Sequence, residues 1–395
     1  MNLRGNDLFS SGPPPAEKQS DLIIVGAGLA GATASAVLGR LGVRVTLVDP
    51  RPNCPPVFKA EKIEPDQLRL MRKLCISEVL LSRAAPIRNI HAFFNGRLYG
   101  TSHTEQYGTY YSDMVNSLRN CFPQNVQCIQ DRVVQISSTA SLQRVRLAGG
   151  EELTCRLVIL ASGLNADLPA ALGLKRLIIQ KHQSIALAFT LASADKRQFA
   201  FDSASYYSIS PARGVDYITV FPIRGGMRAN LFAFPDAADN WVGDFIRNPE
   251  SGLRQCFPKL ASAIGEYRIT SKVESSIIHL YRTEGGPLPG IVLIGDAAQN
   301  VCPSTGMGLS KIFTDVDALS ERVVNWLGTP GMDRDKVASF FLDPVKSAID
   351  TKALRNAFYR RQAATAKSIK WRLHRAKLHL AMQFRRPTEM TPSRE

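Results

Sequence analysis

Residues 21–51 read DLIIVGAGLAGATASAVLGRLGVRVTLVDPR, and this stretch decides the fold of the N-terminal part of the chain. An apolar run over 22–25 leads into Gly26, Gly28 and Gly31, which have the spacing G-x-G-x-x-G. An alanine-rich helical segment follows, and a second β-branched run ends at the acid Asp49. The order strand, tight turn, helix, strand and acid is typical of a dinucleotide-binding βαβ unit.

Each glycine of such a unit has a physical task. Gly26 allows the sharp turn, Gly28 lets the backbone approach a pyrophosphate, and Gly31 lets the helix pack closely on the strand. The helix N-terminus favours bound phosphates, and Asp49 is placed to accept hydrogen bonds from an adenosine ribose. The motif alone leaves NAD and FAD open. The predicted cofactor-binding residues of this unit are Gly26, Ala27, Gly28, Leu29, Ala30, Gly31, Asp49 and Arg51.

The composition is that of a folded globular protein. With 395 residues, 45% of them hydrophobic and 21% charged, the chain is long enough for about two domains. It has no apolar run of transmembrane length, and the polar, proline-rich residues 1–20 predict a flexible leader rather than a secretory signal. The seven cysteines form no C-x-x-C pair, which predicts a reduced cytoplasmic protein without a metal site or a disulfide framework.

The pattern of predicted elements changes along the chain. One amphipathic helix is expected from Pro65 to Leu80, a hairpin around Asn95-Gly96, and one buried strand over 153–163. From 181 to 282 strands follow one another without helices between them, apart from a helical insert near 240–264, which predicts an antiparallel sheet. The α/β pattern then returns, so the first domain is predicted to be discontinuous.

A second glycine–acid motif lies at residues 290–319, GIVLIGDAAQNVCPSTGMGLSKIFTDVDAL. A strand ends at Gly295-Asp296, where the carboxylate can accept a hydrogen bond from a ribityl or ribose hydroxyl. Gly306 and Gly308 precede a helix whose N–H groups can hold a flavin carbonyl, which favours FAD over NAD. The stretch resembles the motif GDAAHxxxPxxGxGxN of the class A flavoprotein monooxygenases. The matching residues are Gly295, Asp296, Ala297, Ala298, Pro303, Gly306 and Gly308.

This resemblance covers roughly residues 20–330 and implies a fold like that of p-hydroxybenzoate hydroxylase. The predicted class is α/β, with a Rossmann-like FAD-binding domain, an inserted antiparallel β-sheet substrate domain and a basic C-terminal helical tail. The resemblance also implies further FAD contacts at Val133, Ser162, Gly163, Asp296, Ala297, Pro303, Gly306, Met307 and Gly308. The predicted division is a leader over 1–20, an FAD-binding domain over 21–85, 104–180 and 283–345, a substrate domain over 86–103 and 181–282, and a tail over 346–395.

The chain departs from the family pattern at four places. Gln299 stands where the family has His, and Ser310 where it has Asn. The middle motif D-G-x-x-S appears as residues 162–165, SGLN, and tyrosines occupy positions 110 and 111 near the helix start where the family has Arg. The chain has no second dinucleotide fold. NAD(P)H is therefore expected to bind transiently as a co-substrate, or a separate reductase is needed.

Three flavin chemistries share this fold. Halogenases carry W-x-W-x-I-P, whereas the tryptophans here are Trp241, Trp326 and Trp371. Geranylgeranyl reductases, which saturate isoprenoid double bonds, carry Y-x-W-x-F-P, and residues 217–222 read YITVFP. We rank first a monooxygenase that hydroxylates an aromatic or lipophilic small molecule through a flavin hydroperoxide, then such a reductase, then a non-catalytic flavin-binding protein. No catalytic side chain is assigned, and the predicted substrate residues are Tyr217, Phe221 and Arg228.

The C-terminal tail carries much of the net charge of +15. Between Lys352 and Arg386 there are eleven Lys and Arg residues and no acid. A helical apolar stripe of Ile369, Leu373, Ala376, Leu380 and Phe384 leaves two comparable alternatives open. The stripe packs on the FAD domain, or it lies on an anionic membrane through residues 352–386, in which case a protein ending near Asp350 keeps FAD and loses liposome binding. Nucleic-acid binding ranks below both.

Overall fold

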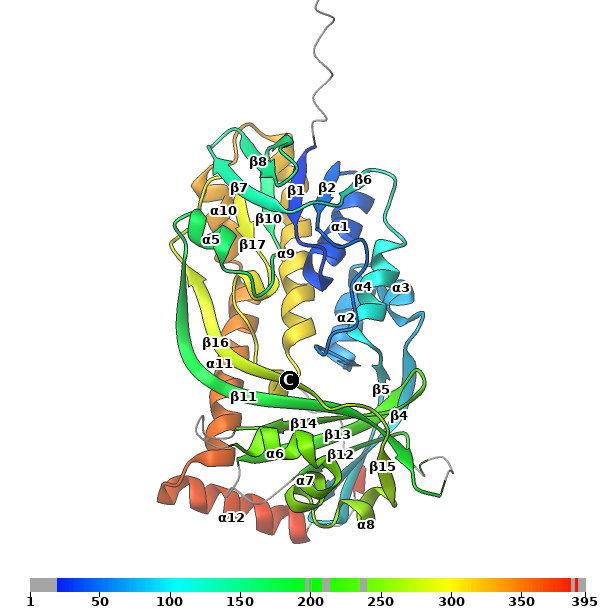
Figure 1. Cartoon of the computed structure of the whole chain (residues 1–395). Coiled ribbons are helices and arrows are strands. Elements are labelled where there is room, and N and C mark those ends of the chain that lie inside the picture. Colours follow the sequence, from blue (N-terminus) through cyan, green and yellow to red (C-terminus); the bar gives the residue numbers. More distant parts are fainter. Residues whose placement is uncertain are drawn as a thin grey trace, which may run out of the picture.

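The computed structural model describes residues 20–195, 199, 201–207, 214–234, 240–384 and 388–389. Within these ranges the chain forms an upper part, built on a parallel sheet, and a lower part, built on a large mixed sheet (Figure 1). Residues 1–19, 208–213, 385–387 and 390–395, which include most of the predicted leader and the end of the tail, lie outside the described residues.

Five parallel strands form the upper sheet, in the order β17-β10-β1-β2-β6. Strands β1, β2, β10 and β17 are buried along their whole length because both faces of the sheet are covered, and Thr46 of β2 is their one polar residue. Their carboxyl ends meet at one edge, where the two glycine-rich motifs begin. The bounds are β1 Leu22–Val25, β2 Val45–Val48, β6 Val126–Ile129, β10 Leu157–Leu160 and β17 Ile291–Leu293.

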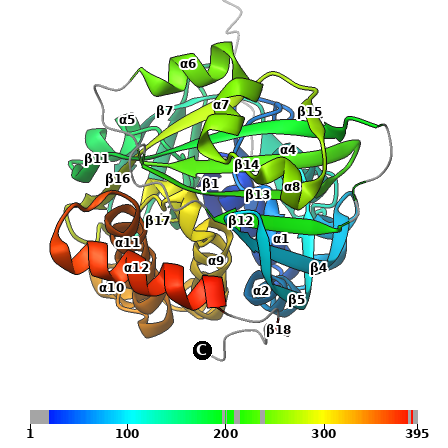
Figure 2. The same ribbon diagram turned by 90° about the horizontal axis from the view of Figure 1, so that it is seen from below.

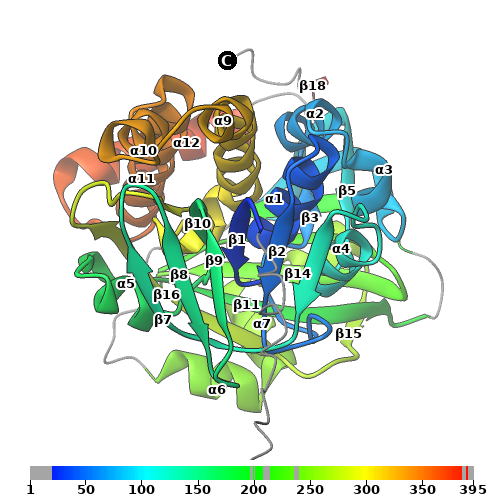
Figure 3. The same cartoon turned by 90° about the horizontal axis from the view of Figure 1, so that it is seen from above.

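Alternate side chains of the upper sheet pack on different layers. Leu22 and Ile24 join a core with helices α1 (Leu29–Arg40), α4 (Tyr111–Arg119) and α9 (Gly308–Gly328). Ile23 and Val25 pack instead on a three-stranded antiparallel sheet, which Figure 3 shows beside β1 and β10. Its strands are β7 (Val133–Ser138), β8 (Gln143–Leu147) and β9 (Glu152–Cys155).

The lower sheet contains ten strands, eight of them in the order β15-β11-β14-β13-β12-β4-β5-β18. β16 pairs with β11 and β3 pairs with β5. The bounds are β3 Lys62–Ile63, β4 Ala85–Phe94, β5 Arg97–Gly108, β11 Lys175–Ser193, β12 Ser203–Tyr207, β13 Val215–Ile223, β14 Gly226–Ala233, β15 Tyr267–Ile269, β16 Glu274–Glu284 and β18 Thr388–Glu389.

The remaining helices cover the two sheets or connect them. α6, α7 and α8 close the outer face of the lower sheet, as the helical insert near 240–264 predicts. Their bounds and those of the others are α2 Pro65–Lys73, α3 Ser77–Leu81, α5 Asp167–Ala171, α6 Trp241–Arg247, α7 Pro249–Cys256, α8 Leu260–Ile264, α10 Arg334–Phe341, α11 Pro344–Thr365 and α12 Ile369–Phe384, with short 3-10 turns at Gly295–Ala297 and Pro303–Thr305.

Two expectations on local structure are wrong. The helix expected from Pro65 to Leu80 is two helices, α2 and α3, because Cys75 has a left-handed backbone (φ 54°). The single strand expected over 153–163 is two strands, and β9 and β10 belong to different sheets. The strands from 181 to 282 pair antiparallel with one another, as expected, and β12 pairs in addition with β4 in parallel. The hairpin at Asn95-Gly96 forms as predicted, with positive φ at both residues.

The segment predicted as a basic helical tail begins with a helix that is packed into the fold. α11 packs on α9, and Gln183 of β11 donates a hydrogen bond to the carbonyl of Ala357. Arg361 donates to the carbonyls of His182 and Gln183 (2.7 and 2.6 Å). A protein ending near Asp350 would lose the contacts of Ala357 and Arg361 and most of α11, so the truncation that separates the tail from the body has to follow α11. Among the described helices, none is both long and apolar enough to cross a bilayer.

Candidate active site

The first glycine-rich turn connects β1 to α1 and tolerates no side chains at two positions. Gly26 has φ 99°, and a Cβ there would lie 2.6 Å from the carbonyl oxygen of Ala161. A Cβ on Gly31 would lie 1.8 Å from the carbonyl oxygen of Gly26, so this glycine sets the distance between helix and strand. Gly28 is the N-cap of α1 and brings no side chain to the helix N-terminus, the kind of position that favours a phosphate.

Asp49 stands at the carboxyl end of β2 beside this turn, and it is 8% exposed. One carboxylate oxygen accepts the N–H of Ala27 (2.8 Å), and the other accepts the N–H of Arg51 (2.9 Å). The Arg51 side chain is largely exposed, with its Nε 3.7 Å from Asp49. The turn and the acid therefore form one unit, in which Asp49 is held by backbone donors at the edge where a ribose would lie.

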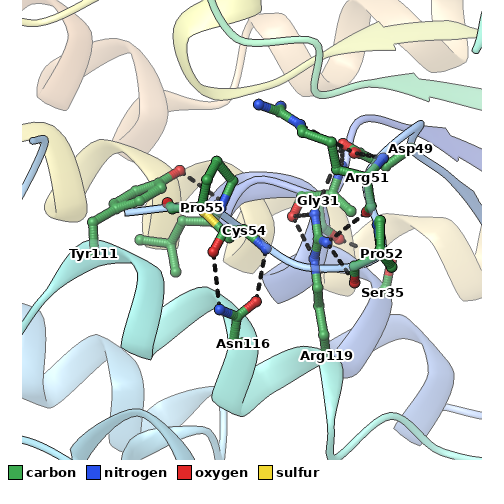
Figure 4. Close-up of polar contacts among 12 residues, drawn as sticks. Gly31, Ser35, Asp49, Arg51, Pro52, Cys54, Pro55, Tyr111, Asn116 and Arg119 are labelled. Carbon is green, nitrogen blue, oxygen red and sulfur yellow. Dashed lines mark hydrogen bonds and ion pairs between the residues drawn. The ribbon is translucent and has the colours of Figure 1, made fainter. Parts of the chain in front are cut away.

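Helix α4 supplies two contacts to the same turn that the sequence analysis did not assign (Figure 4). Arg119 donates from Nε to the carbonyl of Ala27 (2.9 Å) and lies 3.8 Å from Asp49. The hydroxyl oxygen of Tyr111 accepts a hydrogen bond from the N–H of Leu29 (3.0 Å). Tyr111 is one of the two tyrosines that stand near the helix start, where the family has Arg. Asn116 of the same helix pairs with the backbone of Cys54, which fixes the proline-rich loop that follows Asp49.

The second motif lies directly against the first. A Cβ on Gly295 would approach the Cβ of Ala30 to 3.1 Å, so the two turns meet at the centre of the sheet edge. Asp315 of α9 accepts the N–H of Gly295 (2.8 Å). The Asp296 carboxylate lies 3.9 Å from the ammonium of Lys59, which also stacks over the ring of Tyr111 (5.3 Å to its centre). Lys59 thus brings a positive charge between the two motifs.

The loop from Pro303 to Gly308 and the residues before and after it make hydrogen bonds to other parts of the fold. Gln67 of α2 donates to the carbonyl of Gly306 (2.8 Å), and Ser310, which replaces the family's Asn, donates to Asp66 (2.9 Å). Gln299, which replaces the family's His, donates to the carbonyl of Asp350 in α11 (3.1 Å). Both departures therefore have local partners in the fold.

The other predicted cofactor residues differ in burial and in their contacts. Ala297 is fully buried, and its carbonyl accepts the hydroxyl of Thr283 (2.7 Å). Met307 is 8% exposed. Val133 begins β7 inside the core between the two upper sheets. Ser162 and Gly163 follow β10, and Gly163 has positive φ with open space on its Cβ side.

A cavity of about 600 Å³ lies between the upper and lower parts. Its upper wall contains Asp296, Pro303, Gly306 and Gly308 of the second motif, together with Lys59 and Tyr111. Its lower wall is aromatic: the rings of Tyr207 and Tyr217 stack at 5.5 Å, and Phe232 lies 4.8 Å from Tyr217. Tyr217 also donates its hydroxyl to the carbonyl of Ser304 (2.9 Å), so the strand and the motif loop are in direct contact.

Two of the three predicted substrate residues do not line this cavity. Phe221 points to the same side of β13 as Tyr217, but it is fully buried against Ile87 and Ile90 because β4 crosses that end of the strand. Arg228 is 2% exposed and is paired with Glu61 and Glu274 (2.8 and 2.5 Å). Its charge is therefore neutralised inside the protein and is not available to an acidic substrate group. Tyr217 lies in the cavity wall, where it was predicted.

Helix α11 closes the cavity with residues that the sequence analysis placed in the tail, namely Asn356, Tyr359 and Arg360. The guanidinium of Arg360 lies 4.4 Å from the centre of the Tyr217 ring, and its Nε is 3.2 Å from Asp216. Burial raises the pKa of the Asp216 carboxyl to about 6, against the opposing effect of Arg360. The basic pattern of 352–386 could not distinguish this partly buried arginine from its exposed neighbours.

Charged groups also line the wall near the motif loop. Burial raises the pKa of the Glu61 and Glu64 carboxyls and lowers the pKa of the Lys62 ammonium. Glu64 caps α2, and a Cβ added to Gly306 would lie 3.4 Å from a carboxylate oxygen of Glu64. The sequence signal for this segment was weak, because it follows a proline-rich loop.

The residues of this edge fit FAD. Gly26, Gly28 and Gly31 bring no side chains of their own to the turn, Asp49 and Asp296 offer acceptors for hydroxyl groups, and Lys59 offers a cation near Asp296. Gly308 begins α9 with open space on its Cβ side, so the N-terminus of that helix can approach a flavin ring. The cavity below it provides space for the ring and a substrate.

Comparisons with known proteins agree with this geometry. A structure of p-nitrophenol 4-monooxygenase from Pseudomonas putida superposes with a TM-score of 0.73 over 93% of this chain and 95% of that chain, at 17% identity. A probable FAD-dependent monooxygenase from Pseudomonas aeruginosa, PqsL, gives a TM-score of 0.67 over 88% and 99%, at 20% identity. These likenesses show a shared fold.

Two curated relatives are also similar in sequence. Digeranylgeranylglycerophospholipid reductase of Thermoplasma acidophilum is 24% identical over 74% of this chain and 74% of its own length. The 3-demethoxyubiquinol 3-hydroxylase of Escherichia coli is 26% identical over 47% of this chain and 44% of its own length.

A family model described as FAD binding domain matches residues 19–327, which is most of the chain. The match includes both glycine-rich motifs and the strands of the lower sheet that form the cavity wall. The chain is therefore an FAD-dependent oxidoreductase with a monooxygenase-type fold, and it belongs to the FAD binding domain family.

Proposed function

We propose that this protein is a monooxygenase that hydroxylates an aromatic or lipophilic small molecule and uses NAD(P)H as electron donor. One observation carries the proposal: a single cavity joins the loop of the second motif to an aromatic wall of Tyr207, Tyr217 and Phe232. An apolar ring placed on that wall faces the loop directly. Bound FAD supplies the redox chemistry, which is reduction by NAD(P)H followed by reaction with O2.

The chain's own residues position the reactants and exclude water. The Tyr217 hydroxyl, bonded to Ser304, fixes the wall against the motif loop. Asn356, Tyr359 and Arg360 close the cavity from α11. Arg360, which is paired with Asp216 through Nε, lies over the Tyr217 ring in the cavity wall, where its other N–H groups can orient a phenolic or carbonyl oxygen. Such positioning matters because an electrophilic oxygen transfer needs the substrate carbon close to the oxidant in a dry site.

The test follows the flavin absorbance during anaerobic addition of NADPH and then of O2. We expect bleaching by NADPH and return of the oxidised spectrum with O2, faster when an aromatic substrate is present. A yellow protein that NADPH does not bleach requires an external reductase, and a colourless protein that takes up no FAD contradicts the assignment of the cofactor.

A variant links this test to the cavity. Thr219 lines the cavity on β13, whereas Ile218 of the same strand faces the core below. We expect Thr219→Leu to raise the KM for a stimulating phenol by about tenfold, which corresponds to about 1.4 kcal/mol of lost binding. The control Ile218→Leu keeps the core volume and leaves that KM unchanged. Equal KM values for Thr219→Leu and wild type would place the substrate elsewhere.

A reductase of isoprenoid-type double bonds is the second candidate. The similarity to digeranylgeranylglycerophospholipid reductase favours it, as do Tyr217, Phe221 and Pro222, which match three of the four fixed positions of that pattern. Anaerobic reoxidation of the reduced protein by a polyprenyl lipid would distinguish it from a monooxygenase, which needs O2.

We further propose that the protein works in the cytoplasm in contact with an anionic membrane surface, through the basic segment 352–386. This segment contains eleven Lys and Arg residues and no acidic residue, which supports the proposal. The names of the two curated relatives support it as well, since one designates a glycerophospholipid and the other a ubiquinol. Binding to anionic vesicles that weakens with added salt would be the expected behaviour.

A further inference from the structure

Helix α12 presents a row of apolar side chains to solvent. Ile369, Leu373 and Leu380 are 74%, 58% and 53% exposed, and Ala376 between them is also exposed. At 100° per residue these four positions fall within one narrow stripe along the helix. The expectation that this stripe packs on the FAD domain is therefore wrong, because it faces away from the protein.

Side chains on the other side of α12, which lies next to α11 (Figure 2), attach the helix to the protein. The Trp371 ring lies 5.8 Å from Tyr359 of α11, and Arg375 donates to the carbonyls of Ala363 and Ala366 (3.2 and 2.7 Å). The His379 ring packs edge-on against Phe94 at 5.3 Å. These contacts come from both ends of the helix, so its orientation is fixed and the apolar stripe is held outward.

Positive charge borders the stripe on both sides. Lys370 and Lys377 lie next to it on one side and Arg372 on the other, all three exposed, with exposed Lys367 just before the helix. The basic residues that serve the fold are different ones: Arg360, Arg361 and Arg375 have partners inside the protein. A helix that lies in a membrane interface typically has Lys and Arg on both sides of an outward-facing apolar stripe, from where these side chains reach the lipid headgroups.

The same helix borders the active-site cavity. Tyr359 lines the cavity, is 44% exposed, and shares a hydrogen bond with His374 of α12 (3.0 Å). Tyr207, another lining residue, lies 6.3 Å from Tyr99, and Tyr99 belongs to the small core on which Met382 of α12 packs. Two walls of the cavity are thus connected to the inner face of α12, whose outer face is apolar and cationic.

We propose that the outer face of α12 docks on an anionic phospholipid bilayer and that the cavity takes its substrate from that bilayer beside Tyr359. The substrate class is then a lipid-dissolved molecule with an aromatic or unsaturated reacting group and a long apolar chain. This inference rests on the proposed function for the chemistry, but the docking surface is argued from α12 alone. A membrane-dissolved molecule would move from the bilayer into the cavity without crossing water, which lowers the cost of desolvating its chain.

The first test measures co-sedimentation of the full-length, FAD-loaded protein with vesicles of equal parts phosphatidylcholine and phosphatidylglycerol. We expect replacement of Lys370, Arg372 and Lys377 by Gln to weaken binding about a hundredfold or more, since each basic residue contributes about 1 kcal/mol at such a surface. We expect Ile369→Gln/Leu373→Gln/Leu380→Gln to weaken it at least tenfold.

The matched control replaces exposed apolar residues at the other end of α11. Leu342 and Val345 are 76% and 61% exposed and lie about 30 Å from α12 along a helix of this length. Leu342→Gln/Val345→Gln should bind vesicles like the wild type. Equal binding by the α12 variants and the wild type, or equal loss in the control, would overturn the assignment of the docking surface.

The second test separates delivery from chemistry. NADPH oxidation is measured with a dodecyl-substituted phenol dissolved in the vesicles and with a water-soluble ethyl-substituted phenol. We expect the α12 stripe variant to lose stimulation by the vesicle-borne phenol and to keep stimulation by the soluble one. If neither phenol stimulated NADPH oxidation by the wild type, the proposed function would be contradicted. The sedimentation result would still decide whether α12 is the docking surface. Full use of the vesicle-borne phenol by the stripe variant would overturn delivery through α12.

Discussion

Gly31→Ala is expected to purify without flavin. The added methyl group would lie 1.8 Å from the carbonyl oxygen of Gly26 and 3.2 Å from the Cβ of Ala161, so α1 has to move away from β1. Overpacking of this kind costs about 3 kcal/mol when the backbone itself has to shift. The shift distorts the turn that a pyrophosphate would contact, so we expect FAD affinity to fall about a hundredfold. The measurement is the flavin-to-protein ratio together with an FAD titration of the apoprotein.

The control for this prediction is another helical glycine with free space. Gly328 ends α9, a Cβ added to it would meet no neighbouring atom within 4 Å, and its backbone does not need a positive φ. Gly328→Ala should keep the flavin and the same melting temperature or a slightly higher one, because Ala favours the helix. If Gly31→Ala retained flavin as well as Gly328→Ala does, the close contact between α1 and β1 would not be needed for binding.

The N-terminal motif was predictable because its residues act locally. Gly26, Gly28, Gly31 and Asp49 lie within one βαβ unit, and the spacing along the chain fixes their relation in space. The second motif could be identified for the same reason. By contrast, Arg119 reaches the first turn and Lys59 reaches Asp296 from segments whose packing no local pattern reveals, and their residue types are common on protein surfaces.

The substrate side of the site shows what the alternation of side chains along a strand cannot predict. Even spacing correctly puts Tyr217 and Phe221 on one side of β13, but only the crossing of β4 decides that Phe221 is covered while Tyr217 lines the cavity. Arg228 is a similar case, because its partners Glu61 and Glu274 come from distant segments. The apolar stripe of α12 was also recognisable as a pattern, whereas its outward direction depends on Trp371, Arg375 and His379 on the opposite face.

Asp315→Ala is expected to destabilise the protein by about 3–5 kcal/mol, the range for breaking a buried ion pair by removal of one partner. Asp315 is 1% exposed and lies 3.2 Å from the ammonium of Lys311 and 3.1 Å from that of Lys346. Burial lowers the pKa of the Lys346 ammonium, but Asp315 and Asp350 outweigh it and raise this pKa overall. Without Asp315, two buried ammonium groups share Asp350 as their remaining acidic partner in this cluster, so a net positive charge stays in the core between α9 and α11.

The same substitution removes the acceptor for the N–H of Gly295, so charge and hydrogen bond have to be separated. Asp315→Asn keeps an acceptor oxygen but not the charge; we expect it to be nearly as unstable as Asp315→Ala while retaining more FAD. Urea unfolding with excess FAD in every sample gives the free energies, because ligand binding itself adds stability. The control is Glu152→Ala, which breaks an exposed pair with Arg144 and should cost no more than about 1 kcal/mol. If Asp315→Ala lowered the free energy of unfolding as little as Glu152→Ala does, the cluster of Lys311, Asp315, Lys346 and Asp350 would not be what holds α11 on the FAD-binding part. The positions of Tyr359 and Arg360 on α11 would then depend on other contacts.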